Sequence, residues 1–166
     1  NSNDSYWLSN ARAPLTGFPE ILGGEKQEPS LRSRLGHILV KERLSGTDGL
    51  PGKLADSRSV REFALNSRTL SAELFLDEVL KGLCPAGAIE LDEPRLKVDV
   101  REACEVLARW DRRGNLDSVG AHIWDQFWRN VVRIPSAERY LKPFDPAAPL
   151  VTPGQLNLAD KRVAQA

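Results

Sequence analysis

Hydrophobic residues recur at intervals of three and four in several stretches of the chain, which is the spacing of one buried face of an α-helix. The first stretch begins at Pro29, a residue tolerated in a first helical turn, and runs to Leu44, with Gly46 placed to end the helix. Ser57 offers an N-cap for a short second helix. Longer helices are predicted at about 71–83, 98–110 and 119–133, and a short helical pattern runs from about 156 to the end.

The predicted helix at 119–133 has a wide aromatic face. Trp124, Phe127 and Trp128 fall in register with Ile123. Two tryptophans on one helix could stack on a cofactor, but large aromatic residues at these spacings are more typical of a hydrophobic core. We therefore expect these side chains to pack in the core.

Single residues mark the limits and the polar faces of these helices. Gly114 is placed to close the helix at 98–110, and Asp117 and Ser118 offer an N-cap for the next helix. In the helix at 71–83 the charged residues, Glu78 among them, are predicted to face away from the apolar stripe.

The rest of the chain has no regular period. Residues 1–28 are rich in Gly, Pro, Ser and Asn and are expected to form an irregular segment, followed by a helical domain at 29–166. A charged, proline-containing loop is expected from Pro85 to about Lys97, and no alternating run is long enough to predict a sheet. A short strand within residues 1–28 is the alternative left open. The fold class is therefore mainly α.

The composition limits the kinds of partner that we expect for the chain. Its 166 residues are 41% hydrophobic and 28% charged, which argues against a disordered tail or a fibrous repeat. Twenty-three basic and twenty-three acidic residues give a formal net charge of zero, so we expect neither nucleic acid nor a membrane surface as a partner. The sequence contains no Met, and we expect it to be a piece of a longer protein.

The candidate metal ligands are few and poorly spaced. Cys84 and Cys104 lack CxxC spacing, and His37 and His122 are isolated within helical patterns, which argues against a structural zinc site. Neither histidine has a nucleophile nearby in sequence, so both are interpreted as ordinary helix residues. The cysteine count alone leaves two buried thiols and one disulfide as alternatives.

Short amide and hydroxyl side chains are concentrated at the start of the chain, in Asn1-Ser2-Asn3-Asp4-Ser5-Tyr6-Trp7-Leu8. Such side chains build turns, and Asn3-Asp4-Ser5 also matches a glycosylation sequon. A third interpretation is an oxyanion donor, because the NH₂ group of an asparagine donates hydrogen bonds without carrying charge.

The first block of residues, together with Pro14-Leu15-x-Gly17-Phe18, resembles the β-chain region of the penicillin acylase family that bears its oxyanion-hole asparagine. A second block, Leu107-Ala108-Arg109-Trp110-Asp111 with Asp117-Ser118-x-Gly120-Ala121, is similar to a later part of the same chain. Both blocks follow the order of the family and lie closest to its acyl-homoserine lactone and aculeacin A acylase branch.

The resemblance implies an N-terminal nucleophile hydrolase of αββα architecture. A self-cleaved precursor exposes a serine whose α-amine activates its hydroxyl, and the serine attacks an acyl amide. On this chain the resemblance implies that Asn3 is the side-chain oxyanion donor and that Arg32 orders the active site. No cofactor and no metal are implied.

The serine nucleophile and the sheet core are missing from this sequence, so we expect an internal helical section of the β-chain that is inactive alone. Its expected partners are the remaining α- and β-chain segments and a small acyl amide, such as an N-acyl-homoserine lactone, a lipopeptide or a β-lactam. The resemblance also implies a disulfide between Cys84 and Cys104, and with it a periplasmic or extracellular location. A non-catalytic helical interaction module is the alternative function.

Overall fold

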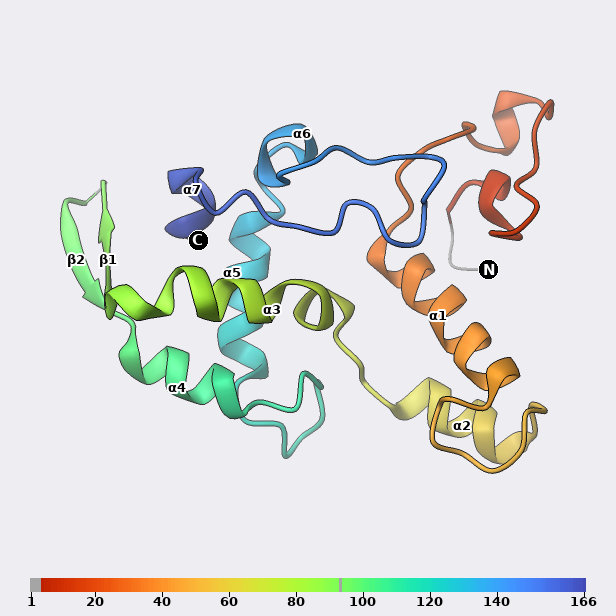
Figure 1. The fold of residues 1–166 in the computed structure, drawn as a ribbon, viewed down its shortest axis with the longest axis horizontal. Coiled ribbons are helices and arrows are strands. Elements are labelled where there is room, and N and C mark those ends of the chain that lie inside the picture. Colours follow the sequence, from red (N-terminus) through yellow and green to blue (C-terminus); the bar gives the residue numbers. More distant parts are fainter. Residues whose placement is uncertain (1–3, 93) are drawn as a thin grey trace. The chain divides into compact units, whose positions relative to one another are not determined.

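The computed structural model describes residues 4–92 and 94–166, which form helices and one small sheet (Figure 1). By internal contacts the chain divides into two compact units. Unit 1 comprises Asn1–Asn66 and Phe144–Thr152, and unit 2 comprises Ser67–Pro143 and Pro153–Ala166.

Unit 1 contains two short 3-10 helices followed by two α-helices. These are η1 (Tyr6–Leu8), η2 (Glu20–Leu22), α1 (Leu31–Ser45) and α2 (Ser57–Leu65). Helix α1 ends where the sequence predicts, because Gly46 adopts the left-handed conformation with φ 76°. Helix α2 is capped by Asp56 in a reciprocal capping box with Ser59, so the prediction that Ser57 is the cap is wrong.

Buried arginine side chains of α1 hold the loops of unit 1. Arg34 is 1% exposed, and its Nε donates to the carbonyl of Leu150 at 3.1 Å. Arg43 is 3% exposed and pairs with Asp48 at 3.0 Å. A buried charge is costly unless it is paired and hydrogen-bonded, so these contacts fix the loops on α1.

Unit 2 is built around an aromatic and aliphatic core. Phe75 and Leu76 of α3 (Leu70–Gly82) and Trp124 and Val131 of α5 (Ala121–Val131) are at most 1% exposed. The indole N–H of Trp124 donates to the hydroxyl of Ser71 at 2.9 Å, which satisfies its buried polar atom. The expectation of core packing for this aromatic face is confirmed. The elements of the unit are α3 (Leu70–Gly82), η3 (Cys84–Ala86), β1 (Ala88–Leu91), β2 (Leu96–Asp99), α4 (Arg101–Arg109), α5 (Ala121–Val131), α6 (Ser136–Arg139) and α7 (Lys161–Ala164).

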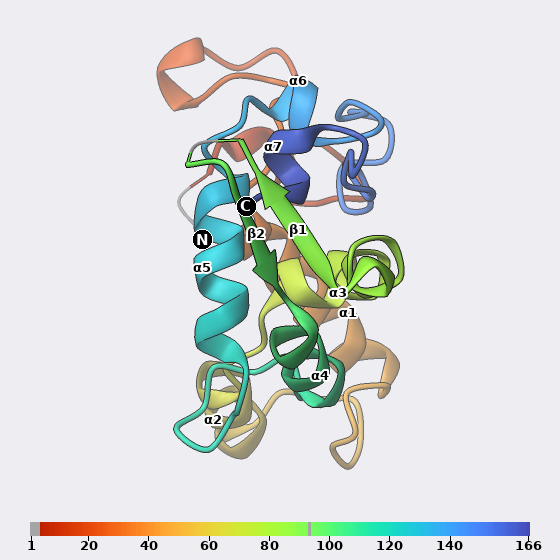
Figure 2. The same cartoon turned by 90° about the vertical axis from the view of Figure 1, so that its left-hand side faces the viewer.

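A β-hairpin occupies the stretch between α3 and α4 where the sequence predicts a loop (Figure 2). Strands β1 and β2 pair antiparallel, with Ile89 opposite Val98 and Glu90 opposite Lys97. Apolar and charged pairs therefore alternate across the hairpin. Each strand has four residues, which is too short for the alternation to stand out in the sequence.

The turn between α4 and α5 also differs from the prediction. Arg112, and not Gly114, takes the positive φ, at 59°. The N-cap of α5 is Gly120, with φ 118°, so Asp117 and Ser118 do not cap this helix. A Cβ on Gly120 would lie 3.0 Å from the side chain of Trp110, which explains glycine at this position.

Glu78 on α3 does not face away from the protein as predicted. Its carboxylate accepts the backbone N–H of Leu156 at 2.5 Å, which holds the C-terminal segment against α3. Burial raises the pKa of Glu78, and the hydrogen bond from Leu156 opposes this shift only in part.

A disulfide joins Cys84, directly after α3, to Cys104 in α4. This bond confirms the expected pairing and excludes the alternative of two buried thiols. It closes a loop with a sequence separation of 20 that contains the whole β-hairpin.

The double variant Cys84→Ala/Cys104→Ala should lower the free energy of unfolding of the chain by about 3 kcal/mol, the chain-entropy value for a loop of this length. Urea unfolding of the two proteins measures the difference. Reductant should destabilise the wild type by a similar amount and leave the double variant unchanged. Two reactive thiols in unfolded, unreduced wild-type protein would contradict the bridge.

Candidate functional site

The carboxylate of Asp4 binds the N-terminus of α1. Its Oδ2 accepts the backbone N–H of Ser30 at 3.0 Å and the hydroxyl of Ser30 at 2.7 Å. Ser30 is the N-cap of α1, and its hydroxyl oxygen accepts the N–H of Ser33 at 3.2 Å. An anion is favoured at this end of a helix because the first N–H groups point towards it. Asp4, which lies 26 residues before Ser30 in the sequence, is thus hydrogen-bonded to the start of α1.

The electrostatics of this contact keep Asp4 ionised. Burial raises the pKa of Asp4, but hydrogen bonds from Ser33 and Ser30 and the positive charge of Arg32 outweigh this effect. The pKa therefore lies below its ordinary value of 3.8. At neutral pH the first turn of α1 carries a fixed negative charge beside it.

The N-terminal segment, residues 4–9, is held at a second point by side chains that follow Asp4. The hydroxyl of Ser5 donates to the carbonyl of Gly24 at 2.6 Å and caps η1 by accepting the N–H of Trp7. Trp7 and Leu8 are 3% and 5% exposed. Gly23, with φ 109°, allows this approach, because a Cβ there would lie 2.6 Å from the hydroxyl oxygen of Ser5.

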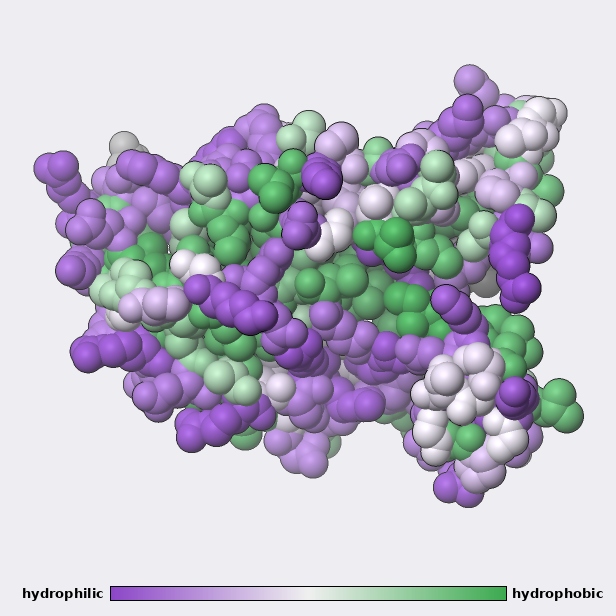
Figure 3. All heavy atoms as spheres, in the orientation of Figure 1, coloured by the Kyte–Doolittle hydropathy of each residue, from purple (hydrophilic) through white to green (hydrophobic). Residues whose placement is uncertain are grey.

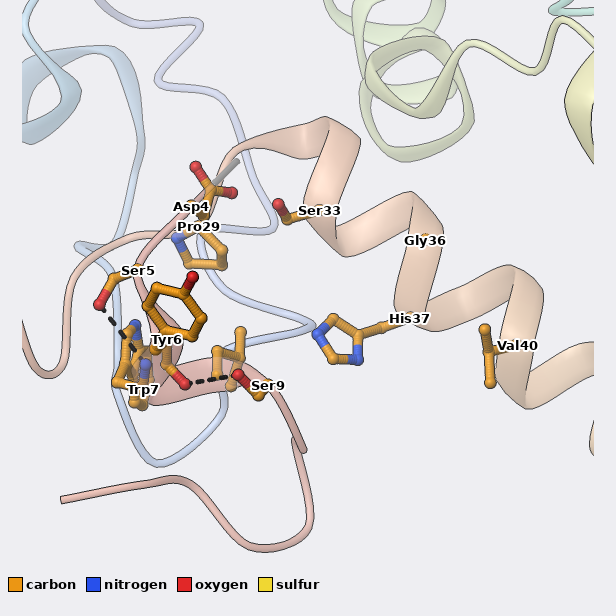
Figure 4. A pocket seen from close by; sticks show the side chains of 11 residues that line it. Asp4, Ser5, Tyr6, Trp7, Ser9, Pro29, Ser33, Gly36, His37 and Val40 are labelled. Atoms are coloured by element: carbon orange, nitrogen blue, oxygen red, sulfur yellow. Dashed lines mark hydrogen bonds between the residues drawn. The ribbon is translucent and has the colours of Figure 1, made fainter. Parts of the chain in front are cut away.

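A cavity of about 470 Å³ lies between this segment and α1 (Figure 4). One wall is formed by residues 4–9 and Pro29, and the other by Ser33, Gly36, His37 and Val40. His37 extends from α1 towards the segment, and Asp4 lies beside Ser33 (Figure 4). The volume is in the range of small-molecule sites. The cavity therefore brings together a carboxylate, hydroxyls and an imidazole from its two walls.

Of the residues that the sequence analysis singled out, Asn3 lies outside the described residues, whereas Arg32, His37 and His122 lie within them. Arg32 is an exposed side chain in the first turn of α1, and its charge acts on Asp4, the residue that follows Asn3. His37 lines the cavity, whereas His122 is exposed on α5 in unit 2.

Sequence reasoning missed Asp4 and Ser33 as members of the site. Asp4 reaches this site through its hydrogen bonds with Ser30, 26 residues away in sequence, which no local pattern predicts. The one signal was Ser30, a favoured N-cap residue directly before the helical stretch, which predicts a helix start but not the carboxylate that binds it.

Among residues 4–92 and 94–166, no group of three or more His, Cys, Asp or Glu side chains could hold a metal ion. Within the same ranges, no helix has the length and apolar character needed to cross a bilayer.

Comparison with known proteins places the chain in a family. The model of the penicillin amidase family matches residues 1–164. The chain is 39% identical over 167 aligned residues to aculeacin-A acylase of Actinoplanes utahensis, an alignment that covers 100% of this chain and 20% of that protein. It is 28% identical over 168 residues to the acyl-homoserine lactone acylase PvdQ of Pseudomonas savastanoi pv. phaseolicola, again over 100% of this chain and 20% of the relative.

The chain therefore belongs to the penicillin amidase family. It spans about a fifth of the length of the curated relatives it matches. The resemblance inferred from the two sequence blocks is confirmed, as is the expected mainly α fold.

Asp4→Ala should lower the free energy of unfolding by about 1 kcal/mol at neutral pH, a typical cost of losing a negative charge at a helix N-terminus. Because the fold lowers the pKa of Asp4, this stabilisation is full above about pH 4 and is lost as the pH falls through the lowered pKa. Urea unfolding of wild type and variant between pH 2 and pH 7 measures the difference, and a loss independent of pH would contradict the assignment.

Asp56→Ala is the matched control, because Asp56 caps α2 with the same chemistry. Hydrogen exchange separates the two variants. The N–H of Leu15 donates to the carbonyl of Trp7 at 2.8 Å and should exchange faster in Asp4→Ala only. Equal exchange at Leu15 in both variants would show that Asp4 does not hold the segment.

Proposed function

We propose that this chain is an internal β-chain section of an amidohydrolase that removes an acyl group from an amide. A serine elsewhere in the parent protein attacks the amide carbonyl and forms an acyl-enzyme, which water then hydrolyses. The substrate class includes N-acyl-homoserine lactones and acylated peptides, in keeping with the names of the relatives. The section alone lacks the nucleophile and is expected to be inactive.

In this proposal Asn3 supplies a hydrogen bond to the oxyanion that forms on the attacked carbonyl. A carboxamide NH₂ stabilises that charge without a proton transfer of its own. Arg32 orders the site, since its planar guanidinium can hold two oxygen acceptors at once and stays charged at any relevant pH.

One observation supports the proposal most directly, namely the hydrogen bonds between Asp4 and the N-terminus of α1. They tie the residue next to Asn3 to the helical turn that carries Arg32. The sequence neighbour of Asn3 is thereby held near the turn of Arg32 through one ionised carboxylate, which supports placing both candidate residues in one active site.

The remaining segments of the parent are the proposed partners of this chain. Large apolar side chains are exposed in unit 1, with Ile21 at 92% and Leu54 at 83%. Hydrophobic surface is visible among hydrophilic side chains in the space-filling view (Figure 3). Burial against other parts of the same precursor would remove such surface from water. The disulfide fits a periplasmic or extracellular location.

Asn3→Ala in the intact parent enzyme should lower kcat by about 10²- to 10³-fold, the usual cost of losing one oxyanion donor. Steady-state hydrolysis of an acyl amide measures it, with self-processing checked by gel. Asn10→Ala is the control, because Asn10 is in the same N-terminal region and its side chain accepts the N–H of Arg12 in a local turn. Wild-type kcat in a correctly processed Asn3→Ala enzyme would refute the role.

Arg32→Lys in the intact parent keeps the positive charge but loses the planar guanidinium, which can bind two oxygen atoms at once. The substitution should therefore lower kcat by about tenfold, as expected for the loss of one charge-assisted hydrogen bond. Arg58→Lys is the matched control, because Arg58 is the second residue of α2 as Arg32 is the second residue of α1, and both are exposed. Equal effects of the two substitutions would exclude a specific role for Arg32.

A further inference from the structure

The polar groups of the cavity between residues 4–9 and α1 are unsuited to a fatty acyl chain. Seven of its lining side chains are charged or carry a hydrogen-bonding group, namely Asp4, Ser5, Tyr6, Trp7, Ser9, Ser33 and His37. An alkyl chain would displace water from these groups and offer no hydrogen bond in return, which is unfavourable. A ligand that carries its own polar atoms fits this lining better.

The charge of the cavity separates the two products of amide hydrolysis. When the C–N bond breaks, the nitrogen leaves as an amine and takes up a proton from water at neutral pH, because the pKa of an amine close to an ester or amide group is near that of an α-amino group, about 7.7–8.0. The acyl half leaves as a carboxylate. The ionised carboxylate of Asp4 attracts the ammonium and repels the acid.

The spacing along α1 adds a second polar contact. Ser33 and His37 lie on one face of the helix, one turn or about 6 Å apart. Asp4 is held at the Ser33 end by its bonds to Ser30. The imidazole of His37 can donate to an oxygen of the ligand at the other end, and Tyr6 and Val40 supply apolar surface between polar contacts.

Building on the proposed function, we infer that this cavity is the amine-side subsite of the acylase, with Asp4 facing the amino nitrogen and His37 facing an oxygen of the same molecule. The ligand class is a polar aliphatic amine with a hydroxyl, ester or amide oxygen a few bonds from its nitrogen. His37 is thus a specificity-determining residue for the leaving half of the substrate.

Two substrate series in the intact parent enzyme test the subsite. The first keeps one acyl group and compares amines with and without the oxygen, and the second keeps one amine and varies the acyl chain length. His37→Ala should reduce the preference in kcat/KM for oxygen-bearing amines about tenfold, the loss of one hydrogen bond, and leave the chain-length preference unchanged. His37→Gln, which retains a donor and an acceptor, should recover part of the preference.

Product inhibition tests the same subsite assignment independently. The inhibition constant of the free oxygen-bearing amine should rise about tenfold in His37→Ala, and that of the free fatty acid should stay constant. His122→Ala, a substitution of the one other histidine of the chain, is the control and should change neither. A change in chain-length preference, or an equal loss for all amines, would overturn the assignment.

A failure of the subsite assignment can be distinguished from a failure of the proposed function. If the intact parent hydrolyses no acyl amide, the proposed function is wrong, and calorimetric titration with the oxygen-bearing amine alone still decides the subsite. Binding that weakens in His37→Ala and persists in His122→Ala would support it. Absence of binding to the wild type would refute it.

Discussion

The contact between the Asp4 carboxylate and the first turn of α1 is the interaction on which the geometry of the candidate site depends. The described residues before α1 form no α-helix and bury few large side chains, chiefly Trp7 and Leu8. Their position is therefore set by hydrogen bonds more than by packing. Asp4 supplies charge-assisted bonds among these, because it is ionised and binds N–H and O–H donors at a helix N-terminus.

The two units of the chain are stabilised by different means, and the candidate site belongs to the more polar one. Unit 2 has an aromatic core and the disulfide, which together resist local opening. Unit 1 holds its loops through buried arginines and capped helix ends. Polar contacts of this kind fix direction as well as distance, which suits a segment that is proposed to present the Asn3 carboxamide to a reacting carbonyl. They also make the position of the segment sensitive to pH.

The sequence predicted those features that repeat locally or that two ordered motif blocks carry: the helices α1 to α5, the stop at Gly46, the aromatic core face and the family. The sequence analysis failed where two contacting residues lie far apart along the chain. The bond from Asp4 to Ser30 and the burial of Arg34 against Leu150 each join residues far apart, which periodicity does not register. Glu78 was misplaced for the same reason, since its partner Leu156 is 78 positions away. The hairpin was missed because its alternation lasts only four residues in each strand.

The most direct measurement of the role of Asp4 is a double-mutant cycle on kcat in the intact parent enzyme, combining Asp4→Ala with Asn3→Ala. If Asp4 acts by positioning the segment that carries Asn3, Asp4→Ala should lower kcat about tenfold in the wild-type background and clearly less in the Asn3→Ala background, where only its direct contact with the substrate is left to lose. Equal fold-losses in the two backgrounds would show that the carboxylate and the carboxamide act independently, and would contradict the positioning role.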